Sequence, residues 1–265
     1  MLPHENKIIT ACIIVRLKSK RLPNKALLEI NGFSMTEQLI RRIKQSKYVN
    51  NIVICTSKNV DDKPLIEKAK DWGVECYAGD EDDVLLRMIQ VSKIYNSHAL
   101  IRITGDNPCT DHENLDKMII HHFAKNADYT RTNRLPFGVT SEVMATRMVE
   151  KLYNLIPNTK KTEYMSFFSF NPEVFKCEVL YPKKNQDRPY YSLTVDYQED
   201  LNRIREIYST VPESEIPSLD HILNYIDNNK DNFLVDKEMI IKTPDGSSLT
   251  YENLLLHLDE LAGNC

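Results

Sequence analysis

The first half of the chain alternates short apolar runs with amphipathic stretches. The apolar runs have the length of buried strands, and the amphipathic stretches repeat apolar residues every three or four positions, as on one face of a helix. Strands are predicted at residues 7–15, 51–56, 75–78 and 98–104, and helices at 35–45, 64–72, 82–95 and from 111 onward. Such alternation is typical of βαβ units, so it predicts an α/β fold with a mostly parallel sheet.

After about residue 128 the alternation becomes less regular. Short strands at 142–145 and 174–180 and helices at 146–155 and 162–170 suggest a small lobe inserted at about 130–190 within one domain of residues 1–265. The main pattern then resumes with a strand at 192–195 and a helix at 199–208. A C-terminal extension at about 212–265 is predicted to form a helix, a hairpin at Thr243-Pro244-Asp245-Gly246 and a final amphipathic helix.

Composition narrows the class of protein. The chain has 265 residues, of which 42% are hydrophobic and 27% charged, the balance of an ordinary folded domain. A net charge of −4 argues against a nucleic-acid or membrane-surface partner. The longest apolar run, residues 8–15, is too short to span a bilayer, and the N-terminus lacks the layout of a signal peptide, so a cytoplasmic protein is expected. Six scattered cysteines without a Cys-x-x-Cys pair indicate reduced thiols.

A basic loop follows the first predicted strand. Ten residues contain five cations: Arg16, Lys18, Lys20, Arg21 and Lys25. Guanidinium and ammonium groups suit the oxygens of a triphosphate, and nucleotides bind at the carboxyl ends of strands in α/β sheets. A solvated surface loop is the alternative. The absence of Gly-x-x-x-x-Gly-Lys-Ser/Thr and Gly-x-Gly-x-x-Gly argues against kinase-type and dinucleotide-binding sites.

Two aspartates follow later strand ends. Asp106 comes after the strand at 98–104, and Asp196 comes after the strand at 192–195. Both carboxylates are expected to point into one crevice, where they would bind Mg²⁺, which takes one or two carboxylates together with substrate phosphates. A helix-cap or turn role is the alternative for each.

The basic loop belongs to a longer pattern. Arg16-x-x-Ser19-x-Arg21-Leu22-Pro23-x-Lys25 resembles the signature of the cytidylyltransferases that make CMP-sialic acid and CMP-Kdo, and especially the spore-coat polysaccharide branch. Further blocks stand in the same order at residues 79–87, 102–108 and 194–201. Lys18 and Asn24 stand where this branch commonly has glycines, and Glu163-Tyr164-Met165-Ser166 replaces its Glu-His-Val-Thr.

The resemblance implies a three-layer sheet of the nucleotide-diphospho-sugar transferase type, related to glycosyltransferase A, with CTP as donor and Mg²⁺ as cofactor. It also implies a homodimer formed partly through the inserted lobe. By the same match Arg16, Ser19, Arg21 and Lys25 would contact the triphosphate, and with Asp106 they would form the nucleotide site.

Four further residues are candidates of less specific position. Arg87 would hold the base or ribose, or pair with Asp83 within its own helix. Thr56 would line the nucleoside pocket, or cap a strand end. Glu142 and Arg188, near the inserted lobe, are candidate acceptor contacts, with ordinary surface charges as the alternative.

The predicted reaction is transfer of CMP from CTP to an acidic, sialic-acid-like sugar with release of pyrophosphate, for surface polysaccharide or glycoconjugate biosynthesis. Arg16, Arg21, Lys25 and Asp106 are the predicted catalytic residues, with Asp106 and Asp196 holding the metal. A small phosphonate or phosphate is an alternative acceptor. Rival functions are a metal-dependent glycosyltransferase, suggested by Asp80-Glu81-Asp82, and a non-catalytic nucleotide-binding protein.

Overall fold

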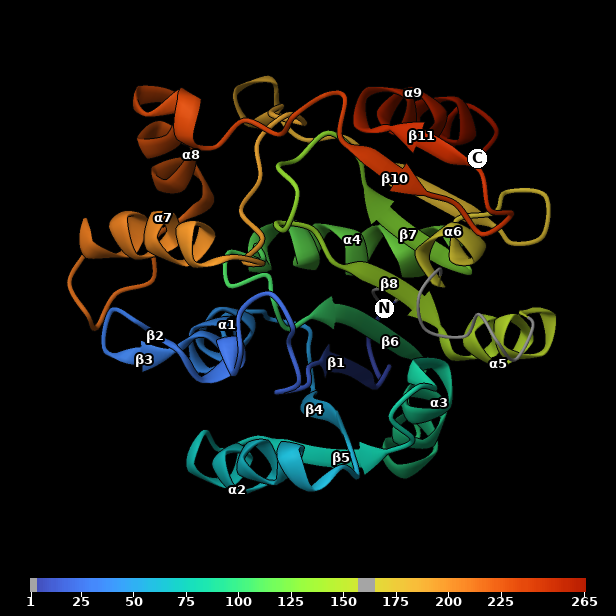
Figure 1. Cartoon of the computed structure of the whole chain (residues 1–265). Helices are drawn as coiled ribbons and strands as arrows, with labels where there is room; N and C mark the ends of the chain where they lie inside the picture. The colour runs from blue at the N-terminus through green and yellow to red at the C-terminus, as the bar shows by residue number, and fades with distance from the viewer. Residues whose placement is uncertain (1–3, 157–164) are drawn as a thin grey trace.

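A seven-stranded sheet forms the centre of the computed structural model, which describes residues 4–156 and 165–265 (Figure 1). The strand order is β5-β4-β1-β6-β8-β7-β9. The strands are β1 (Ile9–Ile14), β4 (Asn51–Ser57), β5 (Glu75–Gly79), β6 (Ala99–Thr104), β7 (Tyr129–Thr132), β8 (Glu142–Ala145) and β9 (Cys177–Leu180). Only the β6–β8 and β7–β8 pairs are antiparallel among these, which confirms the predicted α/β fold with a mostly parallel sheet.

Helices cover both faces of the sheet. Alternate residues of β1 point to opposite faces, as in any strand. Ile9, Ala11 and Ile13 share one apolar cluster with the helices α1 (Met35–Ile43), α2 (Lys63–Asp71) and α4 (His112–Lys125). Cys12 belongs to the cluster on the other face, with α3 (Val84–Tyr95), α5 (Thr146–Leu155) and α6 (Met165–Ser169). Because helices cover both faces of the sheet, its strands must be apolar on both sides. The continuous apolar runs in the sequence meet this requirement.

A third apolar cluster lies beyond one end of the sheet. It joins α7 (Gln198–Ser209) and α8 (Leu219–Asn228) to the hairpin of β2 (Glu29–Ile30) and β3 (Phe33–Ser34). The hairpin was not predicted, because its strands have only two residues each. Its turn residues, Asn31 and Gly32, both have positive φ, as this type of tight hairpin requires.

The C-terminal elements match their prediction. A hairpin of β10 (Ile240–Lys242) and β11 (Ser248–Thr250) is followed directly by α9 (Tyr251–Ala262). Short 3₁₀ helices lie at Lys25–Leu27, Val60–Asp62, Lys184–Gln186 and Lys230–Asn232. No helix within the described residues combines the length and apolar character needed to cross a bilayer.

Two predictions for the second half of the chain were wrong. Strand β7 was missed, because Tyr129-Thr-Arg-Thr lacks an apolar run. The strand predicted at 192–195 is reduced to an isolated bridge between Ser192 and Phe137. The first residues of the helix predicted at 162–170 lie outside the described residues. Glu163 and Tyr164 are among them. Residues 130–190 supply strands to the main sheet as well as α5 and α6, and their role in dimerisation stays a prediction.

A buried arginine links three segments around the site. Arg42 on α1 is fully buried; its Nε donates to the Thr110 carbonyl at 2.8 Å and an Nη donates to the Pro217 carbonyl at 2.8 Å. Its other Nη lies 3.9 Å from Asp111, the residue that caps α4. The side chain therefore ties α1 to the start of α4 and to the segment before α8.

Replacing Arg42 with methionine should lower the free energy of unfolding by roughly 3–5 kcal/mol, because a buried carboxylate loses its cation and two carbonyls lose a donor. Denaturant titration measures the change. Lys68→Met is the control: it removes only an exposed pair with Asp71 and should cost less than about 1 kcal/mol. Equal stability of the two variants would contradict this role for Arg42.

Candidate active site

Two neighbouring strand ends place the basic loop beside Asp106. The loop follows β1, and Gly105 follows β6, the strand paired with β1 in parallel. The Gly105 N–H donates to the Ile14 carbonyl at 2.8 Å, so the two strand ends remain in contact beyond the last ladder pair. A Cβ at position 105 would lie 2.6 Å from the Val15 Cβ, so this approach requires glycine.

Asp106 and Asp196 converge, as predicted. The Val195 N–H donates to the Asp106 carbonyl at 2.9 Å, which places the two aspartates side by side. The Lys25 ammonium then lies 3.4 Å from Asp106 Oδ2 and 2.9 Å from Asp196 Oδ1. Arg21 donates to the same Asp196 oxygen at 2.7 Å. Four of the predicted site residues, from loop and strand ends, therefore form one cluster of alternating charge.

The donor set of this cluster fits Mg²⁺. Both carboxylates face a single cationic group, so their oxygens point toward a shared position. Mg²⁺ favours hard oxygen ligands and is commonly held by one or two carboxylates with waters and substrate phosphates. Within residues 4–156 and 165–265 no group of three or more His, Cys, Asp or Glu side chains is arranged for a metal. Two carboxylates are enough for a metal that also takes phosphate oxygens and water as ligands.

The N-terminal part of the loop is paired with a different carboxylate. An Arg16 Nη donates to the Glu81 carbonyl at 3.0 Å and lies 3.5 Å from Glu81 Oε1. Lys18 lies 3.5 Å from the same oxygen. A hydrogen bond from Asn59 and the two nearby cations keep the pKa of Glu81 below its ordinary value, against partial desolvation. These partly exposed pairs contribute little stability, so the cations can exchange Glu81 for another anion at low cost.

The Asp80-Glu81-Asp82 segment has structural roles that account for its acidity. Asp80 Oδ1 accepts from the backbone N–H groups of Asp82 and Asp83 at 2.9 and 3.1 Å. Asp83 in turn caps α3 by accepting from Leu86 N at 2.8 Å. Acidic residues at a helix start are favoured for this reason. The arrangement supports the helix-start interpretation over a glycosyltransferase Asp-x-Asp site.

The loop conformation explains one departure from the family signature. Asn24 has φ of 55°, in the left-handed region that glycine adopts freely and asparagine tolerates best among other residues. Asparagine thus preserves the backbone that the family obtains with glycine. Lys18 is not among the described residues with positive φ, so the same reason does not apply there. The Ser19 hydroxyl accepts from Leu22 N at 3.3 Å within the loop turn.

Asp62 anchors the loop and was missed by the sequence analysis. Its buried carboxylate accepts from the Leu17 N–H at 2.7 Å and also from the Ser57 hydroxyl. In the sequence it stands two residues before Pro64, so it reads as an acid at a helix start. Only the tertiary structure brings it under the basic loop.

Thr56 lies at the end of β4, and Arg87 on α3 reaches the carbonyl of its neighbour Cys55. Both side chains are buried, and Thr56 Oγ1 and Arg87 Nε have no hydrogen-bond partner among the described residues. Burial lowers the pKa of Arg87, and an Nη of Arg87 lies 3.4 Å from the Cys55 carbonyl. Asp83 caps its own helix, and no ion pair joins it to Arg87 in the described part of the chain. Buried polar groups without partners are candidates for ligand contact.

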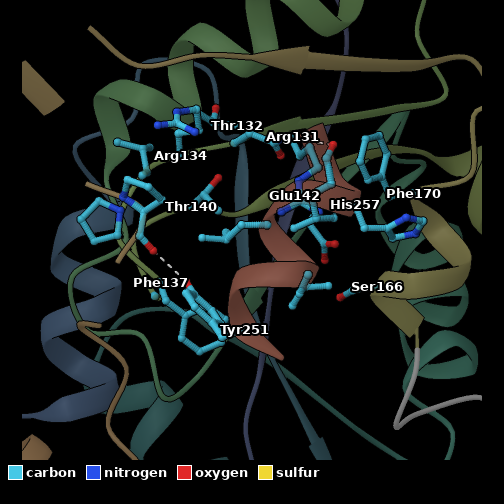
Figure 2. A pocket seen from close by; sticks show the side chains of 18 of the residues that line it. Arg131, Thr132, Arg134, Phe137, Thr140, Glu142, Ser166, Phe170, Tyr251 and His257 are labelled. Atoms are coloured by element: carbon cyan, nitrogen blue, oxygen red, sulfur yellow. Dashed lines mark hydrogen bonds between the residues drawn. The ribbon is translucent and has the colours of Figure 1, made fainter. Parts of the chain in front are cut away.

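A cavity of about 400 Å³ lies close to Asp106 in the sequence, since Thr104 and Asn107 are among its lining residues; Figure 2 shows part of its wall. It begins at Thr104 and Asn107 and extends between β7, β8, α6 and α9. Glu142 lines it and accepts hydrogen bonds from Arg102 and from the Tyr129 hydroxyl, each at 2.5 Å. Burial opposes ionisation of Glu142, but Arg102 and Tyr129 bring its pKa below the ordinary value. Glu142 is therefore a buried carboxylate of the cavity wall rather than a surface charge.

Arg131 adds a second guanidinium to the cavity wall, close enough to Glu142 to help lower the pKa of that carboxyl. It forms no ion pair within the described residues, its Nε is buried without a partner, and its guanidinium lies 5.2 Å from the Phe170 ring centre. Other buried atoms of the cavity wall also have no hydrogen-bond partner in the part of the chain that the structure describes: Arg102 Nε, Asn107 Oδ1, Asn133 Oδ1 and Ser141 Oγ. Such a concentration of unpaired polar atoms indicates a site for a polar ligand.

Arg188, a predicted acceptor contact, lies outside the cavity. Its Nε and an Nη bind Asp227 on α8 at 3.1 and 2.9 Å, and it is not among the residues that line the cavity. This fork geometry ties the segment before residue 192 to α8. A role of Arg188 in acceptor binding stays a prediction, and Arg131 was missed because β7 was missed.

Comparison with known proteins identifies the family. The cytidylyltransferase family profile matches residues 10–240. The chain belongs to the cytidylyltransferase family. This cytidylyltransferase is 29% identical over 225 residues to the spore coat polysaccharide biosynthesis protein SpsF of Bacillus subtilis, covering 83% of this chain and 94% of SpsF.

Solved structures of similar proteins support the family assignment. A cytidylyltransferase from Leptospira borgpetersenii aligns with a TM-score of 0.78 and 26% identity, covering 87% of this chain and 98% of that one. CMP:2-keto-3-deoxy-manno-octonic acid synthetase complexed with CTP aligns with a TM-score of 0.60 at 13% identity, covering 77% of this chain and 99% of that one, which shows the shared fold. The protein is thus a nucleotidyltransferase that transfers CMP from CTP.

In this cytidylyltransferase, Asp62→Ala should release the loop at Leu17 and raise KM for CTP, while lowering the free energy of unfolding by roughly 1–3 kcal/mol. Steady-state pyrophosphate release and denaturant titration measure the two effects. Asp61→Ala is the matched control, since the Asp61 side chain is exposed next to it. An unchanged KM in Asp62→Ala would show that the loop keeps its position without this anchor.

Proposed function

We propose that this cytidylyltransferase transfers CMP from CTP to an acidic sugar, with release of pyrophosphate, in the biosynthesis of a surface polysaccharide or glycoconjugate. The observation that carries the proposal is the cavity that begins at Asn107, next to Asp106, and contains the unpaired cation of Arg131. A ligand anchored at Arg131 would extend toward the aspartates where the donor reacts. The relative SpsF, by its name, acts in spore coat polysaccharide biosynthesis.

On the donor side, the proposed triphosphate contacts are Arg16, Ser19, Arg21 and Lys25. The three cations already lie on one loop and are held by carboxylates that a triphosphate would displace. The nucleoside would lie over Thr56 and Arg87, whose buried polar atoms have no partner among the described residues.

In the proposed reaction, a hydroxyl oxygen of the acceptor attacks the α-phosphorus of CTP, the bond from that phosphorus to the α,β-bridging oxygen breaks, pyrophosphate leaves, and the hydroxyl proton passes to solvent water. Asp106 and Asp196 would hold Mg²⁺, which neutralises charge on the phosphate oxygens. Arg16, Arg21 and Lys25 would stabilise the negative charge that develops as pyrophosphate departs. Orientation of donor and acceptor supplies much of the rate enhancement in such transfers.

On the acceptor side, the charges of the cavity favour a sugar acid over a phosphonate or phosphate. Arg131, which forms no ion pair within the described residues, offers its guanidinium to a carboxylate, whereas Glu142 is a buried anion suited to accept hydrogen bonds from sugar hydroxyls. A dianionic phosphonate or phosphate would bring a second negative charge into a cavity that is also lined by the Glu142 carboxylate. By the family resemblance we also propose a homodimer formed partly through residues 130–190.

Asp106→Asn and Asp196→Asn should each lower kcat for pyrophosphate release by roughly 10²-fold or more, because each removes a metal ligand. The assay uses CTP, Mg²⁺ and a panel of acidic sugars. Asp71→Asn, an exposed aspartate of α2, is the control and should retain full activity. Undiminished release in both site variants would overturn the metal assignment and favour a non-catalytic interpretation of the cluster.

Arg131→Gln should raise KM for the acidic acceptor at least tenfold, with KM for CTP unchanged, because a charge-assisted hydrogen bond to the acceptor is worth roughly 1.5–3 kcal/mol. Arg188→Gln is compared with it: loss of its contact with Asp227 should lower the melting temperature and leave the acceptor KM unchanged. A raised acceptor KM in Arg188→Gln with an unchanged acceptor KM in Arg131→Gln would instead show that Arg188 binds the acceptor carboxylate.

A further inference from the structure

The basic loop also contacts an aromatic residue that follows Asp196. Tyr197 comes directly after that aspartate and immediately before α7, which begins at Gln198. The central guanidinium carbon of Arg21 lies over the Tyr197 ring, 5.5 Å from the ring centre. The same guanidinium donates to Asp196 Oδ1 at 2.7 Å. Arg21 therefore has two different partners on consecutive residues, a carboxylate and the face of a ring.

The backbone of Tyr197 is fixed by the start of α7. The N–H groups of Asp196 and Tyr197 both donate to Asp200 Oδ2, at 2.9 and 2.8 Å. Asp200 is in turn paired with Arg203, three residues further along the helix. Tyr197 itself is 52% exposed. Its ring is therefore held beside Asp196 on a fixed backbone, with much of its surface open to a contact from the loop.

The two partners of Arg21 differ in what happens to them when the donor binds. In the proposed function Asp196 binds Mg²⁺ and Arg21 binds the triphosphate, so the ion pair between them separates. The ring contact can persist, because a ring attracts a cation without a formal charge of its own and leaves the N–H donors of the guanidinium available to phosphate oxygens. Tyr197 is thus the partner that still orients Arg21 after the carboxylate has been taken by the metal.

Arg21 needs such a partner more than the buried cation of the loop does. The Lys25 side chain is only 14% exposed, and its ammonium group also donates to the Val195 carbonyl at 2.7 Å. The Arg21 side chain is 53% exposed. A long, exposed side chain loses much rotamer freedom when it is fixed, so a contact that restricts it beforehand makes binding more favourable.

We propose that Tyr197 is a positioning residue for the transfer reaction, whose ring orients the Arg21 guanidinium toward the triphosphate of CTP. The proposal rests on the proposed contact between Arg21 and the triphosphate, and it deepens that contact by naming what holds the arginine in place. Tyr197 acts through Arg21 and is not itself a catalytic residue.

A double-mutant cycle between Tyr197 and Arg21 tests this role. The Kd of CTP in the presence of Mg²⁺, measured by isothermal titration calorimetry, requires no acceptor. Tyr197→Leu should raise this Kd about three- to tenfold, because the cation–ring contact is lost. In an Arg21→Gln background the same substitution should change the Kd less than about twofold, because no cation is left to orient.

Two conservative variants separate the ring from the hydroxyl group. Tyr197→Phe and Tyr197→Trp both keep an aromatic face and should keep the Kd of CTP within about twofold of the unmodified enzyme. Tyr197 is exposed and its backbone N–H is retained in every variant, so none of them removes the start of α7. A loss in Tyr197→Phe as large as in Tyr197→Leu would assign the effect to the hydroxyl group and overturn the proposal.

Phe33→Leu is the matched control. It removes a ring from the guanidinium of Arg41, 3.8 Å from the ring centre and outside the basic loop, and should leave the Kd of CTP within about twofold. An unchanged Kd in Tyr197→Leu, or an equal loss with and without Arg21, would overturn the proposal while leaving the proposed triphosphate contact intact. An unchanged Kd in Arg21→Gln alone would overturn both.

Discussion

The ammonium group of Lys25 lies between two carboxylates, and the active site depends on that arrangement. Asp106 and Asp196 would repel one another without a cation between them. Their separation is set by the backbone hydrogen bond from Val195 to Asp106, not by the side chains. The same position suits a metal ion with phosphate ligands, so the cluster is organised for cations before a nucleotide contributes any contact. At the other end of the loop, a cation and a carboxylate are paired in the same way, in Arg16 and Glu81.

Long-range packing maintains this short-range geometry. Asp196 lies ninety positions after Asp106, and it reaches the sheet only because α7 and α8 pack on the β2–β3 hairpin in a separate apolar cluster. Arg42 joins that cluster to the start of α4 through carbonyl groups on both sides. The buried polar links determine where the second aspartate lies, whereas apolar burial supplies most of the stability.

The strand ends that carry the basic loop and Asp106 could be predicted from the sequence, because local patterns specify them. The apolar runs of β1 and β6 lead directly to the basic loop and to Asp106, so residues near strand ends were identified as a group. Asp62 and Arg131 could not be found this way. Asp62 acts through Leu17, forty-five positions earlier, and Arg131 lies in a strand whose polar residues conceal its place in the sheet. Contacts that depend on tertiary structure leave no periodic signal.

The residues that line the cavity are distributed differently along the chain. The elements around the cavity come from β7, β8, α6 and α9, which are separate in sequence and include the helix beyond the family profile. A donor common to the family requires one fixed set of charges, whereas acceptors differ in shape and in apolar surface. Variation is therefore best tolerated where an element touches the acceptor and not the triphosphate. Helix α9 lines the cavity and is attached by Asn133 and Arg134 to the loop after β7, and none of its residues contacts the basic loop through a hydrogen bond or ion pair within the described residues.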